Sequence, residues 1–300
     1  MEDKNCYFLL TGASGFLGME ICNQLINAGY PLIAIQHQAP TAANVLSLPA
    51  DITELEQLEA IFQKYAIQTI IHAASLLNTN SNQNPDLAFR VNVLGSYNLL
   101  ECARKYQVKR FIYASSFSLI GHRPLEDCPV DESQIPIPDN FYGETKHFVE
   151  RLGIGYALKF GFEFAAGRMG TLVGPGKATS TSSWRMDIFN RLKTGGPIIT
   201  KYAPQVRLPI SGVEDTARAL ITLATAEKLA HPIYHLPHDD LALEEVAAMV
   251  KSLRADAKFT FGDSTEVDMP PLISFQRFTD EFSNFKHLPL VEALLEYKLS

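Results

Sequence analysis

Long hydrophobic runs are absent from this sequence, and so are other signals of membrane or secreted proteins. No stretch approaches the roughly 18 apolar residues that a membrane-spanning helix needs, although 46% of the 300 residues are hydrophobic. The opening MEDKN is mostly charged and leads directly into a short apolar run, so we expect no signal peptide. These absences predict a cytoplasmic protein with a sizeable core and no membrane partner.

Cysteine is scarce, and positive charge is not clustered. The four cysteines are widely separated without a C-x-x-C pair, which favours free thiols over a disulfide framework. The formal net charge is −7, and lysine and arginine form no run, which argues against a nucleic-acid partner. The motifs G-x-S-x-G and G-x-x-x-x-G-K-[ST] are missing too, so hydrolase and kinase functions lack support.

What is present is an alternation of short apolar runs and longer amphipathic segments. Apolar runs bounded by Gly, Pro or polar residues predict buried strands at 7–10, 32–35, 69–74 and 110–116. Helical spacing of apolar residues predicts helices at 15–29, 53–65 and 85–107. TELE at 53–56 has the form of a capping box and predicts a helix start. This order predicts an α/β fold, a Rossmann-like doubly wound parallel sheet covered on both faces.

The second half of the sequence is less regular. A helix at 142–160 and a strand at 163–169 are followed by VGPGKATSTSS, which is typical of a loop. Further helices are expected near 212–228 and 243–254. We expect a dinucleotide-binding domain at 1–169 and a smaller, mainly substrate-binding region at 170–300, with some segments returning to the first domain.

Three glycines follow the first predicted strand. Gly12, Gly15 and Gly18 stand where that strand gives way to an amphipathic helix. Glycine lets the backbone approach a ligand and adopt a positive φ, and a helix N-terminus offers N–H groups to a pyrophosphate. The strand–turn–helix context therefore predicts a dinucleotide site, with a ligand-free tight turn as the alternative.

The choice between NAD and NADP depends on the end of the second strand. An acidic residue usually binds the adenosine ribose there, but this sequence has Gln36 and His37. No Lys or Arg occurs between Lys4 and Lys64, so a 2′-phosphate would lack a strong cation nearby. We expect NAD, and NADP stays open through His37. Asp51 is a candidate acceptor for the adenine amine, or else a loop carboxylate or helix cap.

A tyrosine and a lysine stand four residues apart in YGETK, on one face of a predicted helix. A free tyrosine with a pKa of about 10 is a poor base, but an ammonium next to Tyr142 favours its phenolate. Lys146 supplies that ammonium. Ser115 and Ser116 end a predicted strand, where parallel sheets bind ligands, and a hydroxyl there can orient an alcohol or carbonyl.

These motifs in this order resemble the extended short-chain dehydrogenase/reductase family, also called the NAD-dependent epimerase/dehydratase family. The resemblance covers nearly the whole chain and includes TGASGFLG, ADIT, IHAAS, VNVLGSYNLLE, YASSFSLIG, YGETKHFVE and RLPISGVEDTARAL. It implies that Tyr142 is the general base or acid, that Lys146 lowers its pKa and holds the nicotinamide ribose, and that Ser116 is the catalytic serine. It also implies that Asn92 supports the active site and that Arg207 binds an anionic substrate group.

The resemblance extends to ligand contacts and assembly. We expect the cofactor to be bound by Gly12, Ser14, Gly15, Phe16, Leu17, Gly18, Gln36, His37, Asp51, Ile52, Ala73, Ala74, Ser75, Tyr142 and Lys146. We expect the substrate to be bound by Ser116, Ser118, Thr171 and Arg207. Relatives often pair through helices that match 85–107 and 142–160, which predicts a homodimer.

Departures from the family pattern bear on the substrate. Sugar-nucleotide 4,6-dehydratases carry an Asp-Glu pair where Phe117 and Ser118 stand here, which disfavours dehydration. The 4-epimerases usually carry an asparagine where Thr171 stands. The segments RMGTLVGPGKATSTSS and VRLPISGVEDTARA are similar to members that oxidise small hydroxy acids, so the Ser/Thr residues at 179–183 and Arg207 would meet a carboxylate.

We therefore expect an enzyme that passes hydride between nicotinamide and a secondary alcohol of a sugar or small polyhydroxy acid. A nucleotide-sugar epimerase and a non-catalytic dinucleotide sensor are the alternatives.

A few other residues are open to more than one interpretation. The histidine-rich segment 231–240 suggests metal ligands, but its two prolines break any helix, so we expect strand and no metal. His72 is expected to be buried and hydrogen-bonded. Trp184 and Arg185 are candidates for substrate contact or for packing.

Overall fold

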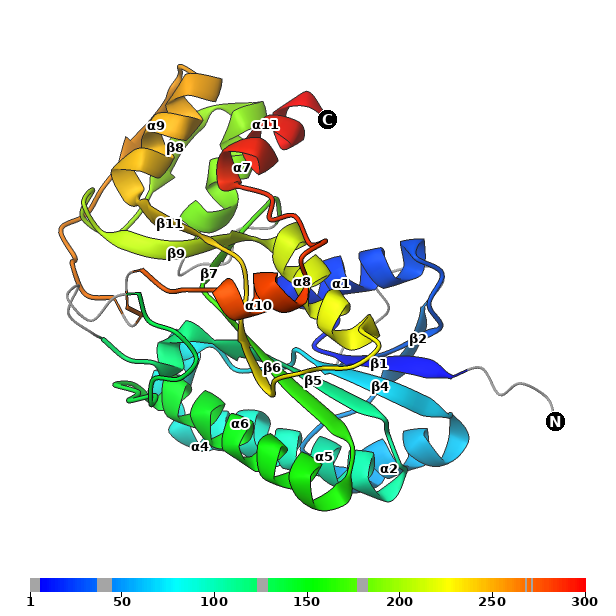
Figure 1. Ribbon diagram of the computed structural model, residues 1–300. Coiled ribbons are helices and arrows are strands. Elements are labelled where there is room, and N and C mark those ends of the chain that lie inside the picture. The colour runs from blue at the N-terminus through cyan, green and yellow to red at the C-terminus, as the bar shows by residue number, and fades with distance from the viewer. Residues whose placement is uncertain (1–5, 37–44, 123–128, 177–182, 268, 271) are drawn as a thin grey trace.

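A seven-stranded parallel sheet forms the centre of the molecule (Figure 1). The computed structural model describes residues 6–36, 45–122, 129–176, 183–267, 269–270 and 272–300. The strand order is β10-β6-β5-β4-β1-β2-β3. The strands are β1 (Tyr7–Thr11), β2 (Leu32–Gln36), β3 (Leu46–Pro49), β4 (Ile67–His72), β5 (Arg110–Ser116), β6 (Glu163–Met169) and β10 (Ile233–His235). The predicted doubly wound parallel sheet is confirmed.

Helices cover both faces of this sheet (Figure 1). One face packs against α2 (Leu55–Lys64), α5 (Gly95–Lys105) and α6 (Phe141–Phe160), and the other against α1 (Phe16–Asn27), α8 (Val213–Thr225) and α10 (Gln276–Glu281). Side chains alternate between the faces, so Leu9 and Phe111 join the first core while Leu10 and Ile112 join the second. Because both faces are buried, the middle of each strand is mostly apolar, and the polar residues Ser115, Ser116 and Arg168 lie toward the strand ends.

The switch in strand order lies between β1 and β4. β2 continues the sheet in one direction and β5 in the other, so the crossover helices leave toward opposite faces. Ligands of such sheets bind in the crevice at the carboxyl ends of these strands. The glycine turn after β1 and the serines that end β5 lie on this edge.

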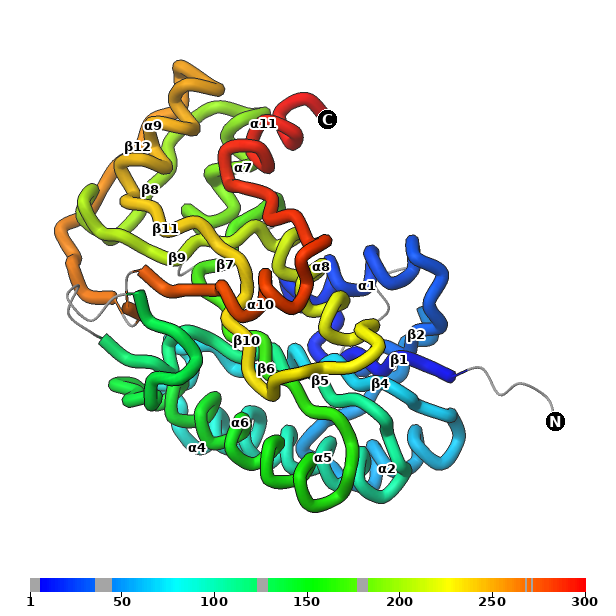
Figure 2. Tube along the Cα trace, in the orientation of Figure 1, coloured from blue at the N-terminus to red at the C-terminus, as the bar shows by residue number. Residues whose placement is uncertain are grey.

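A smaller unit with its own core stands above the sheet (Figure 2). It contains a three-stranded sheet, a two-stranded sheet and three helices. These are β7 (Thr171–Val173), β9 (Arg207–Gly212), β11 (Asp239–Ala242), β8 (Gly196–Ile199), β12 (Ala257–Thr260), α7 (Trp184–Thr194), α9 (Leu243–Leu253) and α11 (Leu290–Leu299). Three elements after residue 170, α8, β10 and α10, pack on the central sheet or belong to it. The division into a dinucleotide-binding domain at 1–169 and a substrate-binding region at 170–300 with returning segments stays a proposal.

One local prediction needs correction. Thr53 does not cap α2, which begins at Leu55. Thr53 instead donates its N–H (2.9 Å) and its hydroxyl (2.8 Å) to Asp51 Oδ1, a local turn that competes with capping. The helix predicted at 85–107 is confirmed as a continuous helical run of α4 (Pro85–Ala88), a π-helical segment η1 (Phe89–Leu94) and α5, and a short α3 (Asn78–Gln83) precedes it. Within the described segments, every helix is too short or too polar to cross a bilayer.

A charged cluster ties the C-terminal segment to the rest of the fold. His287 lies with Nδ1 2.6 Å from Asp215 Oδ2 on α8 and Nε2 3.3 Å from Asp239 Oδ1 on β11. Burial lowers the pKa of His287, but its hydrogen bonds and charge interactions with the two carboxylates outweigh burial and raise that pKa to about 9. The imidazolium therefore persists in the folded protein at neutral pH.

We expect the stabilising effect of His287 to be lost between about pH 6.5 and about pH 9. A pKa that is higher in the folded than in the unfolded chain adds stability that is complete below the unfolded pKa and lost as pH rises through the folded one. Melting temperatures of the native protein and of His287→Gln measure this effect. Their difference should be largest at low pH and should shrink as pH rises, and a constant difference contradicts the assignment.

Candidate active site

The three glycines of the turn between β1 and α1 have different surroundings. Gly12 has a φ of +73°, and a Cβ added there would lie 2.6 Å from the amide nitrogen of Ala74. A Cβ on Gly18 would overlap the carbonyl oxygen of Gly12, whereas one on Gly15 would meet the same oxygen at 3.1 Å. Gly12 and Gly18 thus permit close backbone packing, and Gly15 stands exposed at the helix start.

The N-terminus of α1 fits the pyrophosphate of a dinucleotide. Gly15 is its N-cap, no side chain caps it, and its first turn has no acidic residue. The first N–H groups of α1 and its dipole therefore meet no negative charge from the helix itself. Ser14 and Gly15 are exposed, while Phe16 and Leu17 are partly buried. A bound dinucleotide would supply the nicotinamide ring that accepts or returns a hydride.

The expected adenosine contacts stay predictions. Gln36 ends β2, and His37 lies outside the described residues. Asp51 is partly buried, and its Oδ1 accepts the two hydrogen bonds from Thr53. Ile52 is buried and packs against Gly95. An adenine contact by Asp51 would have to share its carboxylate with Thr53.

A chain of buried hydrogen bonds links β1 to the segment η1. His72 Nδ1 lies 2.6 Å from Thr11 Oγ1, and Nε2 lies 2.8 Å from Ser96 Oγ. Ser96 donates to the carbonyl oxygen of Asn92 at 2.5 Å, so its oxygen is the acceptor for a proton on Nε2. Burial, and then the charge of Lys146, lower the pKa of His72 to about 3. His72 is neutral, and the expectation of a buried, bonded histidine is confirmed.

Asn92 joins the loop after β4 to α6. Its Oδ1 accepts hydrogen bonds from the amide of Leu76 (2.7 Å) and from Ser75 Oγ (3.1 Å). Its Nδ2 donates to Leu76 O (3.1 Å) and to Thr145 Oγ1 (3.2 Å). The residue is 1% exposed and lies in the π-helical segment, a feature that often marks functional sites. The role of Asn92 in supporting the active site stays a prediction, and its hydrogen bonds to the loop after β4 and to α6 are consistent with that role.

The first turn of α6 packs closely against the end of β5. Asn140 caps the helix by accepting the amide of Gly143 at 2.8 Å. A Cβ added to Gly143 would lie 2.5 Å from the carbonyl oxygen of Ser118. The missing side chain brings the turn that carries Tyr142 against the segment Ser116–Ser118.

Tyr142 and Lys146 lie one turn apart on the buried face of α6. Lys146 is 2% exposed, and its Nζ donates to the carbonyl oxygen of Ala114 at 2.8 Å. Nζ is 4.6 Å from the ring centroid of Tyr113 and 5.5 Å from that of Tyr142. Burial lowers the pKa of Lys146 to about 7, and the charge of Glu150 opposes this shift.

The two serines that end β5 project to different environments, as strand alternation requires. Ser115 Oγ donates to Glu150 at 2.6 Å. Ser116 Oγ accepts the amide of Ser118 at 3.1 Å and lies 3.2 Å from Ser118 Oγ. Ser116 therefore stays the candidate catalytic serine, with Ser118 beside it. Thr171 begins β7 and is 9% exposed.

Arg207 is already held by acidic residues of the smaller unit. Its guanidinium lies 3.2 Å from Glu245 Oε2 and 3.7 Å from Asp240 Oδ2, and it donates to Asp240 O at 2.6 Å. Contact with an anionic substrate would require exchange of these ion pairs, so that role stays a prediction.

Arg185 on α7 lies within electrostatic range of two tyrosines. Burial lowers the pKa of Arg185, and the charge interactions with Tyr202 and Tyr142 oppose that shift. The sequence left both substrate contact and packing open for Arg185, because no local pattern shows which tyrosines lie near it. The expected Ser/Thr contacts at 179–182 lie outside the described residues.

The histidine-rich segment contributes to strands β10 and β11, which are joined by Leu236, Pro237 and His238. His235 and His238 are buried, and each ring shares a hydrogen bond with a backbone carbonyl oxygen. In the described part of the chain, no group of three or more His, Cys, Asp or Glu residues could hold a metal ion.

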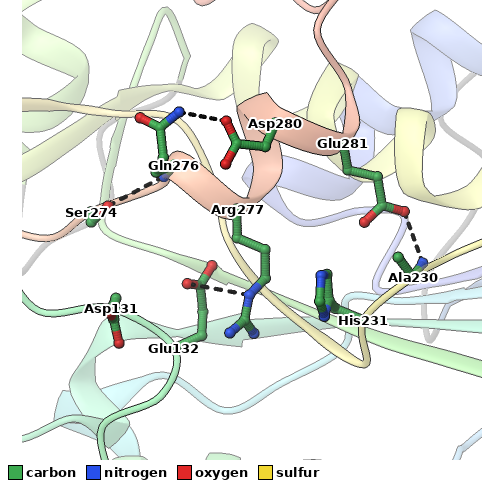
Figure 3. A pocket seen from close by; sticks show the side chains of 9 residues that line it. All are labelled: Asp131, Glu132, Ala230, His231, Ser274, Gln276, Arg277, Asp280 and Glu281. Carbon is green, nitrogen blue, oxygen red and sulfur yellow. Dashed lines mark hydrogen bonds and ion pairs between the residues drawn. The ribbon is translucent and has the colours of Figure 1, made fainter.

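An open cavity of about 550 Å³ lies beside β10 and α10 (Figure 3). Its side chains are engaged with one another: Gln276 donates to Asp280 at 2.6 Å, and Arg277 lies 3.6 Å from Glu132. The cavity is lined by Asp131, Glu132, Ala230, His231, Ser274, Gln276, Arg277, Asp280 and Glu281. None of these is an expected site residue.

The sequence profile of the NAD dependent epimerase/dehydratase family matches residues 8–236. The chain belongs to this family. The match runs from β1 to the end of β10 and so includes the whole central sheet and the Tyr142–Lys146 helix. This is the family, also called the extended short-chain dehydrogenase/reductases, that the motifs predicted.

Individual relatives differ in activity. Bifunctional protein GAL10 of Kluyveromyces lactis is 31% identical over 50% of this chain and 24% of its own length. A UDP-glucose 4-epimerase of Yersinia pestis is 32% identical over 49% of this chain and 47% of its own length. The chain thus spans less than half the length of these two relatives.

Solved structures extend the likeness along the chain. The L-threonine dehydrogenase of Clostridium difficile has a TM-score of 0.86 at 24% identity and covers 98% of this chain and 96% of its own. The UDP-glucose 4-epimerase of Thermus thermophilus, in complex with NAD, has a TM-score of 0.83 at 20% identity and covers 98% and 99%. At these identities the likeness establishes the shared fold.

Proposed function

We propose that this enzyme is a dehydrogenase that passes a hydride between NAD and a secondary alcohol. Tyr142 removes the alcohol proton, Lys146 favours the phenolate, and Ser116 orients the reacting oxygen. One observation carries this proposal. The buried Lys146 ammonium lies against the rings of Tyr142 and Tyr113 at the carboxyl edge of the sheet, the edge that also bears the glycine turn.

The contacts of these residues suit their proposed roles. An ammonium has three N–H donors, and Lys146 uses one on Ala114 O, which leaves donors for the nicotinamide ribose. The remaining charge stabilises the Tyr142 phenolate across a water-poor site, where electrostatic effects are strong. Ser116 accepts an amide at its oxygen and donates its proton to Ser118 Oγ, a hydrogen bond that it would exchange for one to the substrate oxygen.

A small hydroxy acid is the substrate class we propose. Arg185 interacts with Tyr142, so a carboxylate next to the reacting alcohol would find a guanidinium close by. Phe117 and Ser118 occupy the positions of the dehydratase Asp-Glu pair. The L-threonine dehydrogenase of Phytophthora infestans, 25% identical with a TM-score of 0.84, is named for such an acid with a secondary alcohol.

A nucleotide-sugar epimerase is the second candidate, and the name of the Yersinia pestis relative favours it. The same tyrosine and lysine would oxidise a sugar alcohol and then return the hydride, without net change in the cofactor. Thr171 stands where the 4-epimerases usually carry asparagine, which counts against this candidate.

Product analysis separates these functions. Hydroxy acids, sugars and UDP-sugars are each incubated with NAD or with NADP, while reduced cofactor and isomerised sugar are measured. We expect stoichiometric NADH from a hydroxy acid, and more turnover with NAD than with NADP, because no Lys or Arg stands between Lys4 and Lys64. Isomerised sugar without net NADH supports the epimerase instead, and cofactor binding without either product supports a dinucleotide sensor.

We also propose a homodimer that pairs through α5 and α6. These helices expose large apolar side chains, part of which pairing would bury. They are Tyr97, Phe148, Leu158 and Phe160, exposed by 38%, 53%, 85% and 40%.

A further inference from the structure

A fully buried carboxylate lies directly behind the Tyr142–Lys146 pair. Glu150 follows Lys146 by one turn on the same face of α6 and is 0% exposed. Its Oε1 accepts hydrogen bonds from Ser115 Oγ at 2.6 Å and from Arg168 Nε at 3.0 Å, and its Oε2 accepts one from Arg168 Nη2 at 2.8 Å. Arg168 is 2% exposed on β6, directly opposite Ser115 in the sheet.

Stability alone does not account for such a pair. Burying two charges costs desolvation energy that their attraction roughly repays, and apolar residues of similar volume often serve the fold as well. The sheet has a similar pair at its opposite edge, where Arg110 and Glu163 join β5 to β6. There the carboxylate is 37% exposed, so desolvation is smaller. The buried pair stands out by its place beside Lys146.

Among the described residues, Glu150 is the group near Lys146 that carries a negative charge, because the other groups that face Lys146 are neutral. His72 on β4 is neutral, because its pKa is lowered to about 3. The Tyr113 phenol on β5 is neutral as well, since burial raises its pKa well above the ordinary value. Tyr142 is the reacting phenol. Glu150 opposes the loss of the Lys146 proton that burial favours.

We propose that Glu150 is a positioning residue for the reaction, whose buried carboxylate keeps the Lys146 ammonium charged beside Tyr142 and holds the end of β5 through Ser115. Arg168 fixes the carboxylate in place and completes its hydrogen bonds. The inference rests on the proposed roles of Tyr142 and Lys146. It adds a residue that touches neither substrate nor cofactor but determines whether the reacting pair carries the required charge.

Glu150→Gln tests the charge while it keeps the shape of the side chain. Two quantities are measured: the pH dependence of kcat/KM for alcohol oxidation, and the ionisation of Tyr142 in the cofactor-free protein. The second uses isotope-labelled tyrosine and nuclear magnetic resonance, with the Tyr142 signal assigned by its loss in Tyr142→Phe. We expect both transitions to move to higher pH by about one unit or more, because Lys146 without the Glu150 charge loses its proton more readily and the neutral amine no longer lowers the pKa of Tyr142.

Two further variants guard against loss of the fold. Glu150→Asp keeps the charge on a shorter side chain, so its pH profile should stay near that of the native protein even where kcat falls. Glu150→Gln combined with Arg168→Gln avoids an unmatched buried guanidinium, and it replaces the single variant if that one does not fold. The upward shift should be smaller in the double variant but still measurable, because loss of the Arg168 charge offsets part of the effect of losing the carboxylate. Native-like profiles in both Gln variants overturn the proposal.

Glu163→Gln is the matched control at the opposite edge of the sheet. It should lower the melting temperature without moving the pH profile, and a shift equal to that of Glu150→Gln would mean that any weakened β5–β6 pair moves the profile. Failure of the parent proposal looks different. If Tyr142→Phe keeps its turnover, the assigned base is wrong; if that variant is inactive but Glu150→Gln titrates like the native protein, only the role of Glu150 is wrong.

Discussion

Replacing Tyr142 with phenylalanine should abolish turnover while NAD affinity stays nearly unchanged. The variant removes the proton acceptor, and general base catalysis contributes about 10²–10⁴-fold to rate, so kcat should fall by at least that factor. The ring is 8% exposed and can still pack, and the contact of Lys146 with Ala114 O does not involve the phenol oxygen. Steady-state rates and a fluorescence titration with NAD measure the two effects separately.

Tyr156→Phe is the matched control on the same helix. Its hydroxyl donates to Glu101 Oε1 at 2.7 Å, near the end of α6 that is distant from the site. Loss of that hydrogen bond should cost about 1 kcal/mol of stability and leave kcat unchanged. Full activity of Tyr142→Phe would refute the assigned base, and equal losses in both variants would indicate damage to α6 instead of lost chemistry.

The sequence carried the parts of this site that depend on local spacing. Strand ends and helix starts follow from apolar periodicity, so the glycine turn, the strand-end Ser116 and the pair Tyr142–Lys146 could be placed on one edge of a parallel sheet. The sheet and its two covered faces were correctly predicted for the same reason. Each of these features depends on residues that are close together in the sequence, within the length of one helix or strand.

Contacts between segments that are distant in the sequence could not be predicted from local patterns. Arg168 and His235 lie 3.3 Å apart although 67 positions separate them, because β10 returns to pair with β6. In the sequence Glu150 is only the last residue of YGETKHFVE, and no local pattern shows that Ser115 and Arg168 surround its carboxylate. Arg207 was assigned to a substrate anion because its ion-pair partners, on β11 and α9, come more than thirty positions later.

Short polar residues misled the prediction in another way. Thr53 matched the first position of a capping box, but its N–H and hydroxyl donate to the carboxylate of Asp51, two residues earlier, in a local turn. The π-helical segment at Phe89–Leu94 was equally hidden, because a single π-helical turn interrupts the α-helical spacing only once and leaves the flanking helices regular. The geometry of Asn92, which sits in that segment, therefore needed coordinates.

Gly18→Ala should cost about 3 kcal/mol of unfolding free energy or more, the upper range for forcing an extra carbon into a packed site. The added methyl would overlap Gly12 O and lie 2.9 Å from Ala13 Cα, and backbone atoms cannot move aside as a side chain does. Gly15→Ala meets its nearest atom at 3.1 Å, so it should change stability far less. Urea unfolding measures both variants, and NAD titration is done on each that folds.

The two substitutions test different roles: Gly18 is required for the packing of the turn, and Gly15 is proposed to leave room for the cofactor. A methyl on Gly15 would stand at the uncapped start of α1, where the pyrophosphate is proposed to bind, so NAD affinity should fall at least tenfold, or about 1.4 kcal/mol. Gly155→Ala, with no atom within 4 Å of its added carbon, controls for the substitution itself. It should leave NAD affinity unchanged and add about 0.5–1 kcal/mol of stability to α6. Unaltered NAD affinity in Gly15→Ala would place the pyrophosphate away from this turn.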